Sequence, residues 1–157
     1  MSLYGSEVSS DEILRDKFDA VEVFDFDPTS CTPAPPLASA RVAIVTTAGL
    51  RQDGIGTWTE GEGFVVLDGT ERALTLAHTS PNFDRSGMAA DLNVVYPVDR
   101  LDELAAAGTI GSVGSRHIAF MGAQLNHTLT TMRLDTGPAA AKILLDDGVD
   151  VVLLTPV

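Results

Sequence analysis

The residues with the greatest potential for chemistry are two histidines and the polar residues close to them. His78 ends an apolar stretch and precedes Asp84, so it is interpreted as a base, a ligand or a histidine that anchors its loop. Arg116 and His117 precede the apolar run IAFMG. That position places them either at a strand entrance facing a cleft or in a structural hydrogen bond. Proton transfer and carboxylate binding are the chemistry that these four side chains offer.

The spacing of the histidines does not favour a metal site. His78, His117 and His127 match no short zinc motif, and Cys31 is the single cysteine. We therefore predict no metal. A metal-dependent hydrolase, which would need His78, Asp84 and His117 to converge, is kept as a third alternative. The serines lack the G-x-S-x-G setting of a serine hydrolase nucleophile.

Length, composition and charge limit the class of protein. With 157 residues, 45% of them hydrophobic, the chain has the material for one globular core. Its formal net charge of -12 argues against binding to nucleic acid or to an anionic membrane surface, because both depend on clustered Lys and Arg. No apolar run is long enough to span a bilayer, and the acidic opening MSLYGSEVSSDE is unlike a signal peptide. These features predict a cytoplasmic protein.

Residues 1–40 are predicted to form an acidic helix followed by a Pro-rich connector. Ser9 and Glu12 have the spacing of a capping box. An apolar stripe at helical spacing follows, made of Ile13, Leu14, Phe18 and Val21. Cys31 lies in the connector and is interpreted as an incidental thiol.

Residues 41–157 are predicted to form an α/β domain. Strands are expected at 41–47 and 149–154, both apolar on two faces, and at 64–67, 73–77 and 92–96. Asp68 and Gly69 predict a hairpin between the second and third of these strands in chain order. Helices are expected at 99–107, ending at Gly108, and at 139–147, between Pro138 and Gly148. The fold class is a mixed, partly parallel sheet with flanking helices in Rossmann-like layers.

The last predicted strand, VDVVLLTP, leads to the carboxyl edge of the sheet, where such sheets place their ligand-binding loops. An α/β chain would normally continue there with a loop and a returning helix. On this pattern alone a natural C-terminal strand is favoured, and a fold that is incomplete at its C-terminus is the alternative.

Six segments of the chain form an ordered set: VAIVTTAGL, GTWTEGEGFVVL, the stretch from His78 to Asp84, DLNVVYPVDRLDELAAAGTIGSV, RHIAFMGAQ and DDGVDVVLLTP. This set resembles successive segments of the selenoprotein B family of the glycine, sarcosine, betaine and D-proline reductases, and it is most similar to the proline reductase type. The resemblance covers about residues 41–157. In that family the strand resembling VDVVLLTP is followed by selenocysteine, or by cysteine in some members. The resemblance thus implies a chain that stops just before its catalytic residue.

The resemblance also implies an activity. The complete protein would be a subunit of a reductase that cleaves a C–N bond in a small amine or amino acid, with glycine, betaine, sarcosine or D-proline as the type of substrate. It implies no cofactor in this chain, a pyruvoyl group on a partner subunit, and a thiol reductant. The present form, without the nucleophile, is expected to be inactive. The implied site residues are Thr155 and Pro156 in the selenocysteine loop, Thr46, Thr47 and Gly49 at the neighbouring strand end, and His78, Asp84, Arg116 and His117 in support.

A noncatalytic α/β binding or assembly module is the alternative from a different class. It predicts a closed sheet whose final strand is covered on both faces. The reductase interpretation predicts apolar surface left open near Val42 to Val45 and Val149 to Leu154, and a homo-oligomer that buries it.

Overall fold

The computed structural model describes residues 9–19, 32–52, 58, 63–81, 83–124 and 126–157. The chain divides into two compact units, Met1–Pro33 and Ala34–Val157. The assignment of separate roles to 1–40 and 41–157 stays a prediction. Cys31 lies outside the described residues.

The first unit contains helix α1, Ser10–Asp19. The Ser9 backbone N–H donates to Glu12 Oε2 at 2.9 Å, and the Glu12 N–H donates to Ser9 Oγ at 3.2 Å. These reciprocal bonds satisfy backbone donors that the first helical turn leaves free, so the predicted capping box is confirmed. Of the predicted apolar stripe, the side chains of Leu14 and Phe18 and all of Val21 lie outside the described part of the chain.

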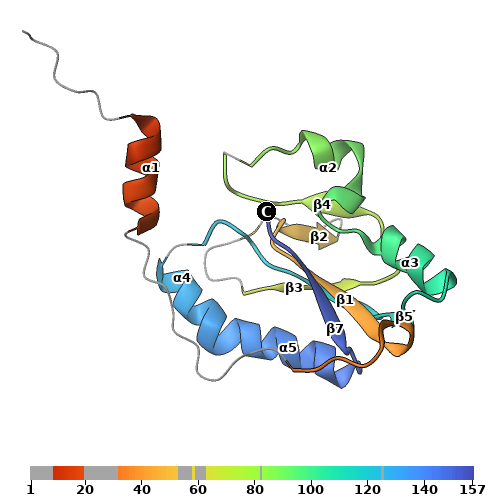
Figure 1. Ribbon diagram of the computed structural model, residues 1–157. Helices are drawn as coiled ribbons and strands as arrows, with labels where there is room; N and C mark the ends of the chain where they lie inside the picture. The colour runs from red at the N-terminus through yellow and green to blue at the C-terminus, as the bar shows by residue number, and fades with distance from the viewer. Residues whose placement is uncertain (1–8, 20–31, 53–57, 59–62, 82, 125) are drawn as a thin grey trace, which may run out of the picture. The chain divides into compact units, whose positions relative to one another are not determined.

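The second unit is built on a mixed sheet centred on strand β1, Arg41–Thr46 (Figure 1). Strands β5, Ser112–Val113, and β6, Arg116–Ala119, run parallel to successive parts of β1. Strand β7, Val151–Thr155, is also parallel to β1 and pairs along its other side. Strand β3, Val65–Asp68, is antiparallel to β6. The predicted α/β class with a mixed, partly parallel sheet is confirmed.

A small antiparallel sheet and several helices complete this unit. The small sheet contains β2, Leu50–Gln52, and β4, Leu74–Leu76. The helical segments are η1 (Leu37–Ser39), α2 (Ser86–Ala90), η2 (Leu92–Val94), α3 (Val98–Ala106), α4 (Asn126–Thr131), the π-helical η3 (Met132–Thr136) and α5 (Gly137–Asp146). Figure 1 shows α4 and α5 in line along one face of the main sheet and α3 on the other.

Alternate residues of β1 enter two cores. Val42 and Ile44 belong to the core that also contains Tyr96 and residues of α3. Ala43 belongs to the core with Ala140 and Leu144 of α5. This alternation follows from the two-residue period of a strand, and it confirms that the strand predicted at 41–47 is buried on both faces.

The two helices that were predicted in the second unit are confirmed by α3 and α5. Pro138 stands in the first turn of α5, as predicted, but the chain is already helical before it, because the π-helical η3 runs directly into α5. Gly148, just beyond the end of α5, has φ of +68°, a left-handed conformation that favours glycine.

The predicted hairpin between 64–67 and 73–77 is wrong. Strand β3 pairs with β6, while β4 pairs with β2 in the other sheet. The turn at Asp68 does form, because its carboxylate accepts the Thr70 N–H at 2.8 Å. Gly69 then donates its N–H to Ser115 O at 2.8 Å, so the chain leaves the turn along the neighbouring loop and not back along β3.

Two further expectations are corrected. Residues 92–96 do not form a strand, because the Asp91 carboxylate accepts the Asn93 N–H at 2.9 Å and starts the 3₁₀ helix η2. Strand β7 exists but is not covered on both faces. Its central side chains, Val152, Leu153 and Leu154, are 38%, 38% and 68% exposed.

Candidate functional site

The carboxyl ends of β1, β6 and β7 meet at one edge of the main sheet, because the three strands are parallel. Ala48, just after β1, pairs with Met121, just after β6. In open α/β sheets ligands bind outside the carboxyl ends of the strands. We call this region, with its residues Thr46–Gly49, Met121–Gly122 and Thr155–Val157, the carboxyl-edge site.

Thr47 holds the residue that follows Pro156. Its Oγ1 accepts the Val157 N–H at 2.9 Å and donates to Val157 O at 3.2 Å. The Thr47 N–H donates to Thr155 O at 3.2 Å. One threonine therefore fixes the backbone on both sides of Pro156.

Thr46 and Thr155 tie the same strand ends to the core. Thr46 Oγ1 donates to Thr155 O at 3.5 Å and accepts the Ala48 N–H at 3.2 Å. Thr155 Oγ1 donates to Val95 O at 2.9 Å. The structure thus brings together the predicted residues Thr46, Thr47, Thr155 and Pro156, while their roles stay predictions.

Gly49 connects this edge to His78. Gly49 has φ of +66°, and a Cβ at this position would lie 3.1 Å from His78 Cα and 3.3 Å from Trp58 Nε1. Its carbonyl accepts the Ala77 N–H at 3.0 Å and the Trp58 indole N–H at 2.9 Å. A side chain at residue 49 would be strained and would displace His78.

His78 is held as a neutral, buried imidazole. Its Nδ1 accepts the Ser80 N–H at 3.2 Å, and its ring stacks on Phe83 with centroids 4.3 Å apart. A neutral ring that accepts at Nδ1 carries its proton on Nε2. Nε2 is buried and has no partner among the described residues. Burial, followed by the nearby charge of Arg85, lowers the pKa of His78 below its usual value. His78 is therefore a neutral donor near physiological pH.

Asp84 supports its own turn. Asp84 Oδ1 accepts the N–H and the hydroxyl of Ser86 at 2.9 and 2.7 Å, and these bonds lower the pKa of Asp84. The neighbouring Arg85 donates from Nη2 to His78 O at 2.7 Å. Within this segment it is thus Arg85, which the sequence did not indicate, that fixes the His78 backbone.

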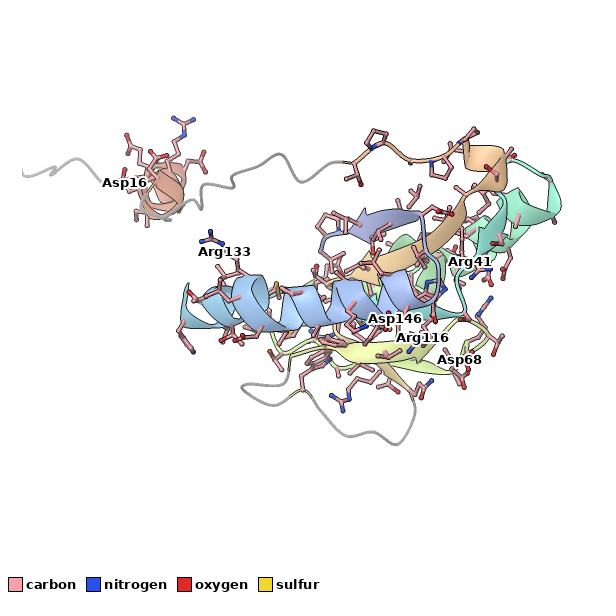
Figure 2. All side chains as sticks on the ribbon, turned by 90° about the horizontal axis from the view of Figure 1, so that it is seen from below. Asp16, Arg41, Asp68, Arg116, Arg133 and Asp146 are labelled. Carbon is pink, nitrogen blue, oxygen red and sulfur yellow. The ribbon has the colours of Figure 1, made fainter. Side chains whose placement is uncertain are left out.

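Arg116 lies at the start of β6, at the opposite end of that strand from the carboxyl-edge site. Its guanidinium forms a bidentate pair with Asp147 at 2.7 and 2.5 Å. The hydrogen bond from Arg116 is the main cause that lowers the pKa of Asp147. Figure 2 shows Arg41, Arg116 and Asp146 at the same end of α5. Arg116 therefore fastens the end of α5 to the sheet.

His117 is enclosed in the core. It is 0% exposed, its Nδ1 accepts the Ile44 N–H at 2.9 Å, and its ring meets Tyr96 edge-on at 5.4 Å. Burial lowers the pKa of His117 to about 4. Of the four predicted supporting residues, the structure places only His78 beside the carboxyl-edge site.

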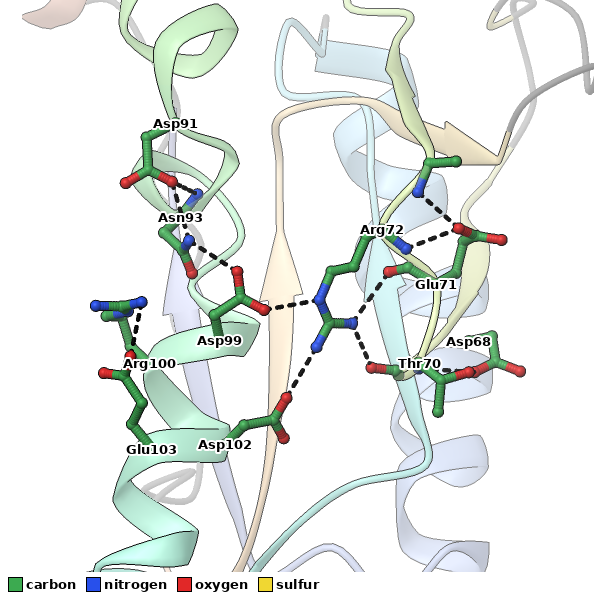
Figure 3. Close-up of polar contacts among 12 residues, drawn as sticks. Asp68, Thr70, Glu71, Arg72, Asp91, Asn93, Asp99, Arg100, Asp102 and Glu103 are labelled. Atoms are coloured by element: carbon green, nitrogen blue, oxygen red, sulfur yellow. Dashed lines mark hydrogen bonds and ion pairs between the residues drawn. The ribbon is translucent and has the colours of Figure 1, made fainter.

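The acidic residues of α3 form ion pairs with arginines (Figure 3). Arg72 pairs with Asp99 at 2.7 Å and with Asp102 at 2.8 Å, which fastens the segment after β3 to α3. Arg100 pairs with Glu103 at 2.8 Å. This cluster has a structural explanation and does not form part of the site.

Sequence reasoning missed Gly122 as a member of the site. A Cβ on Gly122 would lie 2.8 Å from both Thr47 O and Val157 O, so only glycine lets these strand ends come together. The sequence could have indicated this residue, because Gly122 ends the apolar run that begins in β6. Trp58 was also missed as a support of Gly49.

In the described part of the chain, no three His, Cys, Asp or Glu side chains gather closely enough to hold a metal ion. The hydrolase alternative required such a group of His78, Asp84 and His117. The described helices include none with the length and apolar character needed to cross a membrane.

Comparison with known proteins gives one informative similarity. D-proline reductase subunit gamma of Acetoanaerobium sticklandii is 30% identical to this chain over 121 residues, which are 76% of this chain and 49% of that subunit. The chain spans about half the length of this relative. No family model and no solved structure matches the chain. The chain is thus a distant homologue of a reductase subunit.

Proposed function

We propose that this chain forms part of a reductase subunit that cleaves a C–N bond in a small amine or amino acid of the glycine, betaine, sarcosine or D-proline type. Homology to a D-proline reductase subunit supports the class of reaction. The observation that carries the proposal is the tether from Thr47 to Val157, which fixes the chain at the carboxyl edge beside Gly49 and His78.

The nucleophile of this proposal is a selenocysteine, or a cysteine, directly after Val157. The Thr47 tether orients the backbone that leads to it, and Pro156 restricts the preceding turn. Unpaired N–H groups at the start of a following helix would stabilise a selenolate or thiolate. Positioning of this kind favours nucleophilic attack, because the oriented nucleophile loses little further conformational entropy when it reaches the transition state.

The proposed reaction balances with a dithiol as the reductant. A carbon–selenium bond forms as the C–N bond breaks, and the nitrogen leaves with the bonding pair and takes a proton. A thiolate then attacks selenium, the carbon takes a proton, and a second thiol releases the selenolate and leaves a disulfide. The substrate gains two electrons that the dithiol loses. A pyruvoyl group on a partner subunit would supply a carbonyl that activates the substrate amine.

Within this chain, we assign His78 the role of a neutral hydrogen-bond donor toward the substrate carboxylate or the departing nitrogen. Nδ1 accepts from Ser80, and Nε2 retains a proton without a described acceptor, which supports this role. Because Nε2 is buried, the role requires the residues that cover the ring to move when substrate binds. Asp84, Arg116 and His117 would contribute by holding the fold and not by contact with substrate.

The test compares two forms of the protein. One is the 157-residue chain, and the other extends through the downstream reading frame with cysteine at the position after Val157. Both are assayed with the partner subunit and a dithiol. We expect turnover from the extended form alone, and equal turnover from the shorter chain would refute the proposal.

The tether is tested in the extended form. Thr47→Val removes the hydroxyl that binds Val157, and we expect turnover to fall roughly 10- to 100-fold because the nucleophile loses its orientation. Thr109→Val, at an exposed threonine beyond α3, is the matched control and should retain activity. Unchanged turnover in Thr47→Val would show that the hydrogen bonds between Thr47 and Val157 do not contribute to catalysis.

A further inference from the structure

Strand β7 has one free edge. One side pairs with β1 along its whole length, and no strand in the described residues pairs with the other side. Proteins usually protect such an edge with charged residues, proline or a bulge inside the strand. The segment Val151–Thr155 contains none of these protections, and its three central apolar side chains are exposed. The edge is therefore suited to pairing with another strand.

An apolar groove runs beside this edge. It has a volume of about 550 Å³, with Leu144 and Leu145 of α5 on one wall, Val152 and Leu154 of β7 on the other, and Val45 between them. Leu145 is 71% exposed. A contiguous apolar surface of this kind marks a site of protein interaction.

The charges around the edge favour a second copy of this chain as the occupant. Copies with a net charge of -12 repel one another over most of their surfaces. The carboxylates bordering β7 are, however, neutralised or bound internally. Asp147 pairs with Arg116, Asp146 pairs with Lys142, and Asp150 accepts a backbone N–H of β1 at 2.8 Å. The strand β7 itself carries no charged side chain, so two copies can approach at this edge with the least repulsion.

We propose that β7 pairs antiparallel with β7 of a second copy and joins the two sheets across a two-fold axis. The register follows from the backbone. Thr155 O accepts from Thr47 N, so Thr155 and Leu153 direct their backbone groups toward β1, and those of Val152 and Leu154 point outward. All outward groups are paired when Leu153 lies opposite Leu153 of the second copy. Val152 of each copy then exchanges hydrogen bonds with Leu154 of the other.

This arrangement also closes the apolar surface. Val152 and Leu154 of the two copies meet on the groove side, below Leu145 of each copy, and the two Leu153 side chains meet on the opposite face. The interface is isologous, as in most homodimers. The carboxyl ends of the two strands point in opposite directions, so each copy keeps its carboxyl-edge site at its own end. The proposal therefore does not rest on the proposed function.

Cysteine cross-linking tests the register. In a Cys31→Ser background, which removes the single native cysteine, Leu153→Cys places two thiols at a directly opposite pair. Such a non-hydrogen-bonded pair has Cα atoms about 4.5 Å apart, within disulfide range. Leu154→Cys is the matched control, because its symmetry mate is displaced by about 7 Å along the strand. Under mild oxidation we expect a disulfide dimer from Leu153→Cys and little from Leu154→Cys, although Leu154 is the more exposed residue.

Light scattering tests the association itself. We expect the unmodified chain to be a dimer at micromolar concentrations, and Leu154→Lys to weaken the dimer at least roughly tenfold by placing like charges across the axis. Circular dichroism verifies the fold of each variant. A monomer at every concentration would overturn the proposal and assign the edge to another segment or partner. Equal cross-linking of both cysteine variants would overturn the register.

Discussion

Protonation of His117 should destabilise the fold in mild acid. His117 is fully buried, and its Nδ1 accepts the Ile44 N–H inside the central strand β1. A proton on Nδ1 would remove that acceptor and leave a charge in the core. Burial is the main cause that lowers the pKa from 6.5 to about 4, Arg72 lowers it further, and Asp102 and Asp68 oppose the shift.

The sign and magnitude follow from these two pKa values. Between about pH 6.5 and pH 4 the unfolded chain binds a proton at this residue that the native protein excludes, so the free energy of unfolding falls as the pH falls. This group alone should lower it by about 2 kcal/mol at pH 5 relative to pH 7, and by about 3 kcal/mol at pH 4. The lowered pKa of His78 acts in the same direction. Paired carboxylates such as Asp147, whose pKa is lowered, lose their contribution to the free energy of unfolding only at lower pH.

The assay compares urea unfolding of the wild type and His117→Asn at about pH 7 and about pH 5. The Asn side chain can accept the Ile44 N–H but does not titrate. We expect the variant to be less stable at pH 7 by about 2 to 3 kcal/mol, because it leaves a cavity. Its loss between the two pH values should be smaller than that of the wild type by about 2 kcal/mol. Leu67→Ala, at a fully buried residue that does not titrate, should keep the wild-type pH dependence.

Equal losses in the wild type and His117→Asn would refute the reasoning. They would mean that His117 titrates alike in the folded and unfolded states, and that its burial does not exclude the proton. A variant that unfolds at both pH values can be replaced by His117→Gln, which also lacks a titrating group.

Two further substitutions test the supports of the site and of α3. Gly49→Ala should lower the free energy of unfolding, measured by thermal denaturation, by about 2 kcal/mol or more, because it adds a steric contact to a positive φ. Gly108→Ala, at a residue with φ of +70° and open space around it, should cost only about 1 kcal/mol. Equal costs for the two variants would contradict the argument that the contact with His78 matters. Arg72→Met should cost about 1 kcal/mol in low salt by removing the partly exposed pairs with Asp99 and Asp102, and the difference from wild type should shrink in high salt.

Local signals predicted the elements that the structure confirms. The capping box of Ser9, the β-branched run of β1 and the Gly148 boundary of α5 are each set by neighbouring residues, so the sequence displays them directly. The pairing of β3 with β6 joins segments about fifty residues apart, and nothing inside β3 specifies that partner. The same holds for the exposure of β7, which depends on what packs against it.

The residues of the candidate site divide in the same way into those that the sequence could place and those that it could not. Thr46, Thr47, Gly49 and Thr155 could be placed together in advance, because parallel strands end at one edge. Their position before an apolar run placed Arg116 and His117 at a strand entrance, but it did not decide between a cleft and a structural hydrogen bond. The structure puts Arg116 against Asp147 at the far end of β6 and encloses His117 in the core.

Strand β7 connects the two proposals through different groups. The reductase proposal depends on the end of the strand, where Thr47 binds Val157. The dimer proposal depends on its free edge at Val152 and Leu154, whose backbone groups point away from β1. A substitution at the edge therefore leaves the tether intact, and one at Thr47 leaves the edge unchanged. If Leu154→Lys in the extended protein abolished both association and turnover, the edge would have to serve the reductase as well, since the side chain of Leu154 takes no part in the hydrogen bonds between Thr47 and Val157.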